Sequence, residues 1–311
     1  MRLKTIASVL PSRLASPLNP QDKRSVTHQT RPKTRFAPSP NGLLHLGHAY
    51  AAVVAHDLAR ARGGEFLVRI EDIDGTRSRA ELVPEFLADL EWLGLNWDGP
   101  VLHQSSRLAA YAEAGERLKA LGLLYPCHCN RAEVFAAASA SGPDGPLYPG
   151  TCRDRQHNPH GAAWRIDMAR AAELAGPLDW TDEFAGVQTA TPELFGDVVL
   201  LRKEAPASYH LAVTLDDALQ GISLVTRGQD LFLSTPVHRL LQALLGLPVP
   251  IWHHHALLVE TGGRKLAKRR GSAALRDLRL RGDDGLALAQ DLREGRFPAG
   301  LSLAQGVKDK A

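Results

Sequence analysis

Two histidines stand three positions apart at the end of a short segment that is broken by proline and glycine. Pro38, Pro40 and Gly42 mark the change from a short apolar strand to a helix. His45 and His48 then lie at the helix entrance on roughly one face, where backbone amides favour anions. The pattern predicts a nucleotide phosphate site. A proline-rich loop with two surface histidines is the alternative interpretation.

Two lysines, Lys265 and Lys268, lie far downstream in a run where five of the residues 264–270 are basic. A loop with lysines at positions i and i+3 can close on phosphates and neutralise the charge that develops on a departing pyrophosphate. On its own, such a run is more often a solvated surface or a nucleic-acid contact. The histidine pair favours the phosphate interpretation.

Three cysteines, Cys127, Cys129 and Cys152, fall close together in the middle of the chain. Their odd number and tight clustering fit a metal site in a reducing compartment better than a disulfide framework. A Cys-x-Cys pair followed by a third cysteine indicates zinc held by thiolates, with three buried unliganded cysteines as the alternative. Chemistry leaves the fourth ligand open. The nearby side chains that zinc commonly accepts are His128, His157 and His160.

The elements that must position these residues begin with one strand–helix–strand unit. Residues 49–62 form an alanine-rich helical stretch that Gly63 and Gly64 end. Residues 66–70 form an apolar run that predicts a buried strand. Ligands of open α/β sheets bind at the carboxyl ends of the strands, which is where the two histidines follow the first strand.

Apolar spacing next predicts helices over 78–93 and 105–121. Residues 126–160 are rich in Pro, Gly, Cys and His and lack periodicity, which indicates an insertion with little core of its own. The strand-like runs that follow are 198–201, 211–214 and 222–225. A further strand is predicted to start at His253–His255, with consecutive side chains on alternating faces. Residues 271–311 predict a small helical tail.

Composition places the chain of 311 residues among ordinary globular proteins of roughly two domains, with 44% hydrophobic and 23% charged residues. No apolar run approaches the ~18 residues of a membrane span, so no membrane partner is expected. A net charge of +3 indicates no global basic field for nucleic acid. Residues 1–30 are predicted to be a disordered extension, with a transit-peptide-like segment as the alternative.

Four stretches resemble the catalytic domain of glutamyl-tRNA synthetase, a class I aminoacyl-tRNA synthetase. They are Arg35–Pro40, Arg69–Asp74, Ser208–Ala212 and Thr226–Leu231. The resemblance runs in order from about residue 34 to residue 270, which makes it specific. The histidine and lysine pairs are similar to the family's His-x-Gly-His and Lys-Met-Ser-Lys-Ser signatures. Ala267 and Arg269 stand where the second signature has serines.

The resemblance implies an α/β fold: a class I synthetase-type Rossmann nucleotide-binding fold split by a zinc-containing insertion, with a small helical C-terminal region. The expected parts are an extension at 1–30, a first half of the catalytic domain at 31–125, the insertion at 126–197, a second half at 198–262, and the lysine-signature loop with a helical tail at 263–311. Only 43 residues follow Lys268, too few for the anticodon-binding domains of a full glutamyl-tRNA synthetase. The resemblance therefore implies the shortened branch of the family, which attaches glutamate to queuosine in the anticodon of tRNA(Asp).

The resemblance also implies roles for individual residues. His45 and His48 would contact the ATP phosphates, Lys265 and Lys268 the departing pyrophosphate, and these four would be the catalytic residues. Gly47 would complete the ATP site, and Mg²⁺ would accompany ATP. The residues expected around glutamate are Arg35, Phe36, Ala37, Pro38, Ser39, Glu71, Tyr209 and Arg227. Tyr148, four residues before Cys152, matches the family's fourth zinc ligand, so one structural Zn²⁺ per chain is expected.

The expected enzyme is therefore an ATP-dependent ligase that forms glutamyl-adenylate and transfers glutamate to tRNA. Its expected partners are L-glutamate, ATP and the queuosine-bearing anticodon loop of tRNA(Asp), and we expect a cytoplasmic monomer. One alternative is a truncated glutamyl-tRNA synthetase that charges the 3′ end of tRNA(Glu). The others are a catalytically silent RNA-binding paralogue and a small-molecule ligase with the same phosphate signature.

Overall fold

A parallel strand–helix–strand unit opens the fold. Strand β1 (Lys33–Phe36) leads into helix α1 (Leu46–Arg60), which returns the chain to β2 (Glu65–Ile70), parallel to β1. Strand β3 (Leu102–His103) joins β2 in parallel. Alanines and Val53 of α1 share the buried core with Phe66 and Val68. The predicted helix at 49–62 and strand at 66–70 are confirmed.

The computed structural model describes residues 31–155, 158–205, 207–266 and 273–304, all within one unit that begins at Arg31. The predicted extension at 1–30 lies outside these residues. No helix in the described ranges is both long and apolar enough to cross a membrane. Short 3-10 helices lie at Gly75–Arg77, Ala80–Leu82, Gln104–Arg107, Pro192–Phe195 and Gln229–Ser234.

A second parallel group lies beside β1. Strands β11 (Leu224–Gly228) and β12 (Ile251–His255) are parallel, and β12 also pairs with β8 (Asp179–Asp182), which is followed by antiparallel β9 (Gly186–Thr189). The Ser223 backbone N–H donates to the Lys33 carbonyl oxygen at 3.1 Å, which brings β11 next to β1. The predicted strand at 253–255 is confirmed as part of β12, and the one at 222–225 is confirmed from Leu224, where β11 begins.

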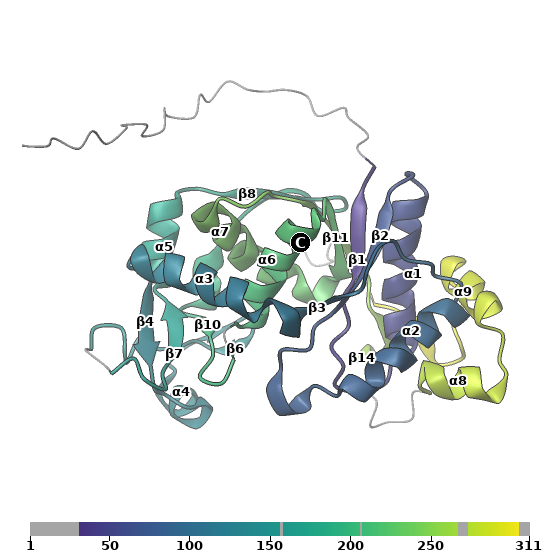
Figure 1. Ribbon diagram of the computed structural model, residues 1–311, viewed down its shortest axis with the longest axis horizontal. Coiled ribbons are helices and arrows are strands. Elements are labelled where there is room, and N and C mark those ends of the chain that lie inside the picture. The colour runs from purple at the N-terminus through teal and green to yellow at the C-terminus, as the bar shows by residue number, and fades with distance from the viewer. Residues whose placement is uncertain (1–30, 156–157, 206, 267–272, 305–311) are drawn as a thin grey trace, which may run out of the picture. The chain divides into compact units, whose positions relative to one another are not determined.

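The predicted strand at 211–214 is wrong, because these residues belong to helix α6 (Tyr209–Gln220). Ser208 precedes the helix, and Gly221 ends it with a left-handed φ of 65°. All four residues from 211 to 214 are buried, so no exposed polar face reveals the helical period. Helix α7 (Thr235–Leu245) packs beside α6 (Figure 1).

An antiparallel sheet connects the two parallel groups in sequence. It has the order β10 (Val199–Leu201), β7 (Ala163–Ile166) and β4 (Leu124–Cys127). Helices α3 (Leu108–Ala120) and α5 (Met168–Ala175) contribute to its core. Helix α4 (Arg131–Ala137) and a hairpin of β5 (Ser141–Gly142) and β6 (Gly145–Pro146) follow β4. The predicted helix at 105–121 and strand at 198–201 are confirmed.

The C-terminal part combines two helices with a small sheet. Helix α8 (Leu275–Arg281) packs against α2 (Val83–Trp92), and α9 (Gly285–Arg293) packs against α1 (Figure 1). Strand β13 (Leu258–Glu260) pairs with β14 (Arg264–Lys265) and with β15 (Leu301–Leu303). The tail is therefore not helical throughout, because β15 lies in the stretch predicted as a helical tail.

Candidate active site and metal cluster

A cavity of about 340 Å³ opens at the carboxyl ends of β1, β2 and β11. Every residue that the sequence predicted for glutamate lines it: Arg35, Phe36, Ala37, Pro38, Ser39, Glu71, Tyr209 and Arg227. His48 lines it as well, from the first turn of α1. The lining residues that sequence reasoning did not assign are Asn41, Ala51, Thr226, Gly228 and Leu231. Segments that are far apart in sequence thus converge on one cavity.

Arg35 is buried, and acceptors of the protein bind three of its N–H groups. Its Nε and Nη2 donate to the two carboxylate oxygens of Asp217 at 2.8 and 3.3 Å, and its Nη1 donates to the Thr226 carbonyl oxygen at 2.7 Å. A guanidinium carries five N–H donors. Two donors, one on each terminal nitrogen, have no acceptor among the described residues. They suit a two-point contact with a ligand carboxylate.

Asp217 also receives a second buried arginine. Arg69, with no exposed surface, donates from Nη1 to Asp217 at 2.8 Å and lies 3.5 Å from Glu71 through Nη2. Burial alone would raise the pKa of Asp217, but the charges of Arg35 and Arg69 hold it below its ordinary value. Burial outweighs those same charges at Glu71, whose pKa is raised. A ligand ammonium beside Glu71 would favour its ionised form.

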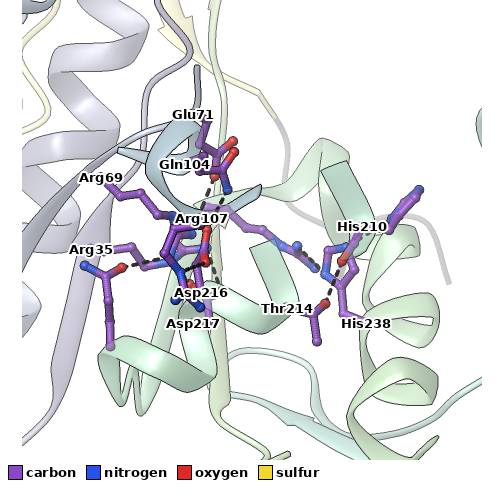
Figure 2. A network of polar contacts seen from close by, with 12 residues as sticks. Arg35, Arg69, Glu71, Gln104, Arg107, His210, Thr214, Asp216, Asp217 and His238 are labelled. Carbon is purple, nitrogen blue, oxygen red and sulfur yellow. Dashed lines mark hydrogen bonds and ion pairs between the residues drawn. The ribbon is translucent and has the colours of Figure 1, made fainter. Parts of the chain in front are cut away.

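Figure 2 shows these carboxylates at the centre of a larger polar network. The neighbouring Asp216 accepts hydrogen bonds from Gln104, Arg107 and Tyr111. Sequence reasoning missed this pair of acids and Arg69. Two adjacent aspartates within the apolar run of α6 were the available signal. They predict buried carboxylates with positively charged partners, because aspartate is rarely buried unless it is paired.

Arg227 lies on the same cavity but has a different environment. Its Nε donates to His254 Nε2 at 3.0 Å, its Nη1 to His238 Nδ1 at 3.0 Å, and its Nη2 to Thr235 Oγ1 at 2.6 Å. Burial lowers its pKa from the ordinary value. These three acceptors are neutral side chains, so no carboxylate among the described residues pairs directly with Arg227.

The two signature histidines cap the first turn of helix α1. The Gly47 N–H donates to His45 Nδ1, and the His45 N–H donates to His48 Nδ1, both at 3.1 Å. Backbone N–H groups can only donate, so each neutral ring carries its proton on Nε2. A Cβ at Gly47 would lie 3.0 Å from the His45 ring, which explains the glycine. This arrangement presents imidazole N–H groups that suit phosphate oxygens.

The lysine pair is only partly described. Lys265 lies in β14, where its backbone pairs with Val259 of β13. The described part of the structure does not include its side chain. Lys268 and its neighbours in the basic run fall outside the described residues.

The three cysteines form a compact cluster with sulfur atoms all within 4.8 Å of one another. Cys129 Sγ lies 3.6 Å from Cys152 Sγ. The hydroxyl oxygen of Tyr148 lies 3.4 Å from Cys127 Sγ and 3.6 Å from Cys129 Sγ. His128 instead directs Nε2 to the Asn158 carbonyl oxygen at 2.9 Å, and His160 is exposed. His157 lies outside the described residues.

Three comparisons relate this geometry to known proteins. The model of the family "tRNA synthetases class I (E and Q), catalytic domain" matches residues 32–294. The chain is 50% identical over 264 residues to the glutamyl-Q tRNA(Asp) synthetase of Rhodobacter capsulatus, covering 80% of this chain and 95% of that protein. It is 44% identical over 263 residues to the protein of that name from Symbiobacterium thermophilum, covering 80% of this chain and 81% of that protein.

Among solved structures, the chain is similar to a glutamate tRNA ligase from Elizabethkingia meningosepticum in complex with its amino acid. The TM-score is 0.64 at 26% identity, and the match covers 78% of this chain and 53% of that one. The glutamate-tRNA synthetase of Elizabethkingia anophelis matches equally well, with a TM-score of 0.64 and 54% of its chain covered. The chain therefore spans about half the length of these two synthetases.

Proposed function

Because the chain belongs to the class I tRNA synthetases (E and Q), on the branch of the glutamyl-Q tRNA(Asp) synthetases, we propose that it activates glutamate with ATP and transfers it to queuosine in the anticodon of tRNA(Asp). It is a ligase with the α/β fold of that class. The observation that carries the proposal is the convergence of Arg35, Arg227 and Glu71 on one cavity.

These three side chains are complementary to glutamate. Glutamate offers two carboxylates and one ammonium, and planar guanidinium groups bind carboxylates through paired hydrogen bonds. We assign Arg35 to the side-chain carboxylate, Arg227 to the second carboxylate, and Glu71 to the ammonium. Ser39 and Tyr209 supply hydrogen bonds from the same wall, while Phe36, Ala37 and Pro38 shape it.

The proposed first step needs no general base, because the attacking group is already a carboxylate. An oxygen of the glutamate α-carboxylate attacks the α-phosphorus of ATP, the bond to the bridging oxygen breaks, and pyrophosphate leaves. The site has to align these atoms and stabilise the charge of the transition state. His45 and His48, with the close backbone approach at Gly47, would contact the phosphates. Lys265 and Lys268 would neutralise the pyrophosphate, and Mg²⁺ would accompany ATP.

In the second step a hydroxyl of the queuosine cyclopentenediol attacks the acyl carbon and releases its proton to solvent, and AMP leaves with the electron pair of the mixed anhydride bond. Unpaired bases of an RNA loop are features that proteins commonly recognise. We propose that the enzyme acts on tRNA(Asp) in the cytoplasm and as a monomer.

The cysteine cluster fits one structural zinc ion. Tetrahedral coordination with Zn–S of about 2.3 Å and Zn–O of about 2.0 Å requires S···S separations of about 3.8 Å and S···O separations of about 3.5 Å. The 3.6 Å between the Cys129 and Cys152 sulfurs agrees with this geometry, as do the 3.4 and 3.6 Å from the Tyr148 oxygen to the Cys127 and Cys129 sulfurs. The Cys152 N–H also donates to that oxygen at 2.9 Å. We propose Cys127, Cys129, Cys152 and Tyr148 as the ligands.

We also propose that the two parallel groups form one nucleotide-binding sheet interrupted by the zinc-bearing region. The contact between β1 and β11 supports this proposal, as does the position of the cavity at their carboxyl ends. Strand β8, from within the expected insertion at 126–197, pairs with β12, so the inserted segment also extends this sheet.

The function is tested by transfer of labelled glutamate with ATP present. The acceptors are tRNA(Asp) carrying queuosine, the same tRNA carrying guanosine, and tRNA(Glu). Labelling of the queuosine form alone is expected. Labelling of tRNA(Glu) would instead indicate ordinary aminoacylation, and no labelling of any tRNA would contradict the proposed acceptor.

A further inference from the structure

We propose that His254 and His238 are positioning residues that hold the Arg227 guanidinium in one orientation, and that Asp182 sets the tautomer of His254. The inference rests on the proposed function, because it gives a role to residues behind the glutamate cavity. It starts from the contrast between the two arginines of that cavity.

Arg35 is paired directly with a carboxylate, and Arg227 is not. Asp217 takes two donors of Arg35, so much of that charge is compensated before any ligand binds. Three of the five N–H donors of Arg227 end on His254, His238 and Thr235. A ligand carboxylate would therefore find in Arg227 the less compensated of the two charges. Neutral side chains must then fix the orientation of the planar Arg227 guanidinium.

The directions of these hydrogen bonds are determined, because arginine has no acceptor. His254 must present a lone pair at Nε2, so its proton lies on Nδ1, which is 2.8 Å from Asp182 Oδ2. Asp182 is itself fixed, since its other oxygen accepts the backbone N–H groups of Phe184 and Ala185, each at 2.9 Å. Asp182 and His254 thus form a rigid support that directs one lone pair at Arg227.

His238 supports Arg227 from a second side. His238 accepts from Arg227 at Nδ1, so its proton lies on Nε2, 3.1 Å from His210 Nδ1. His210 then carries its proton on Nε2, which faces Asp144 at 3.9 Å. Figure 2 shows His210 and His238 side by side. His210 lines a second cavity of about 270 Å³, so this chain runs from Arg227 to another surface opening.

Two substitutions at His254 separate its two contacts. His254→Asn keeps an amide near Nδ1 for Asp182 but leaves Arg227 without its acceptor. His254→Gln places an amide near Nε2 and loses Asp182. We expect His254→Asn to raise the glutamate KM in ATP–pyrophosphate exchange by about 10- to 100-fold, the usual effect of losing a charge-assisted hydrogen bond, with the ATP KM unchanged. His254→Gln should restore part of the loss.

His253→Asn is the matched control. His253 is the adjacent residue of β12, its side chain leaves the opposite face of the strand, and its Nδ1 contacts Glu183 at 2.7 Å. Its substitution should leave both KM values unchanged. Equal effects of His253→Asn and His254→Asn would overturn the inference, because they would indicate general damage to the strand.

A second measurement does not depend on catalysis. Nitrogen-15 NMR of histidine-labelled protein distinguishes the two neutral tautomers, and we expect the Nδ1–H form at His254 and the Nε2–H form at His238. Asp182→Asn should switch His254 to Nε2–H and raise the glutamate KM. The opposite tautomers in the unsubstituted protein would overturn the inference. The expected tautomers without any glutamate-dependent exchange would contradict the proposed function and leave the hydrogen-bond assignment supported.

Discussion

At the scale of single residues, Asp217 is a buried carboxylate whose charge balances two arginines. Two buried guanidinium groups, those of Arg35 and Arg69, share its carboxylate. Removing one partner of a buried ion pair leaves an uncompensated charge and costs about 3–5 kcal/mol. Asp217→Asn should therefore lower the free energy of unfolding by about that amount, as measured by urea denaturation.

The control for this substitution is Asp283→Asn, because Asp283 pairs with Arg281 on the surface. Exposed ion pairs contribute little to stability, so this variant should unfold like the parent. If Asp217→Asn proved equally harmless, Arg69 and Arg35 would have to find other counter-charges, and the network around Asp217 would not be essential.

Two buried histidines make stability depend on pH. Burial, with the nearby charge of Arg227, lowers the pKa of His210 and of His254 to about 4, from an ordinary value of 6.5. Between these pH values the unfolded chain binds the protons and the folded chain does not. The free energy of unfolding should therefore fall as the pH drops from about 6.5 towards 4, by up to about 1.4 kcal/mol per pH unit for each histidine.

Urea midpoints measured at pH 7, 6 and 5 test this dependence. His254→Asn removes one titrating group, so its midpoint should fall less steeply over the same range. A parent protein whose midpoint is constant across this interval would show that these imidazoles are already exposed to solvent or already charged at neutral pH.

The residues that the sequence predicted around the cavity are those carried by short linear motifs. Arg35, Glu71 and Arg227 each belong to one of the stretches that resemble glutamyl-tRNA synthetase, and such a linear motif can be matched without knowledge of the fold. Asp217 and His254 were not predicted as parts of the site, because their roles arise only when α6 and β12 approach β1 and β11. Asp217 lies 182 positions from Arg35, and no local pattern records such a contact.

At the scale of elements, close packing of α9 on the end of α2 depends on one glycine. A Cβ at Gly285 would lie 2.2 Å from the Trp92 carbonyl oxygen and 2.5 Å from its ring. Gly285→Ala should therefore force the helices apart and destabilise the fold by about 1–3 kcal/mol, the usual cost of overpacking. Thermal unfolding measures the effect.

Leu286→Ala is the neighbouring control, because the Leu286 side chain is 64% exposed. It should change the melting temperature little. A Gly285→Ala protein as stable as the parent would mean that α9 can shift away from Trp92 without loss of packing.

Elements whose apolar pattern fits one period were predictable, including the buried strand at 66–70, but the buried part of α6 was not. The alanine-rich period of α1 and the glycines after it placed that helix within a few residues. The run 211–214 was predicted as a strand, because this buried part of α6 offers the same apolar letters as a buried strand. Strand β15 was missed because its pairing depends on β13, where Glu260 pairs with Leu301, and not on its own composition.

At the scale of the whole chain, the cavity exists because two parallel groups meet although they are far apart in sequence. The Lys33 N–H donates to Ser223 Oγ at 3.0 Å across 190 positions, and Arg35 reaches Thr226 across 191. The intervening region must therefore fold so that its two ends return together. Its antiparallel sheet shares a core with α6 and α7, but the stretch around the cysteines contributes only a small buried cluster.

This small cluster predicts how the molecule responds to loss of metal. Without zinc, the stretch around Cys127, Cys129 and Cys152 retains little apolar burial to offset its chain entropy. Purified protein should contain about one zinc per chain, and chelation should expose residues 127–155 to rapid amide hydrogen exchange. Residues 33–70, in the first parallel unit, should stay protected because their core lies elsewhere.

Tyr148→Phe makes the test specific to the fourth ligand. The variant keeps the ring that stacks beneath Arg165 and removes only the oxygen near the sulfurs. Zinc affinity should fall, because water would have to replace the phenol as the fourth ligand, while the metal-free proteins should exchange alike. Equal zinc affinity of variant and parent would exclude Tyr148 and return the fourth position to a histidine. Rapid exchange in both regions after chelation would mean instead that the metal supports the whole fold rather than this stretch alone.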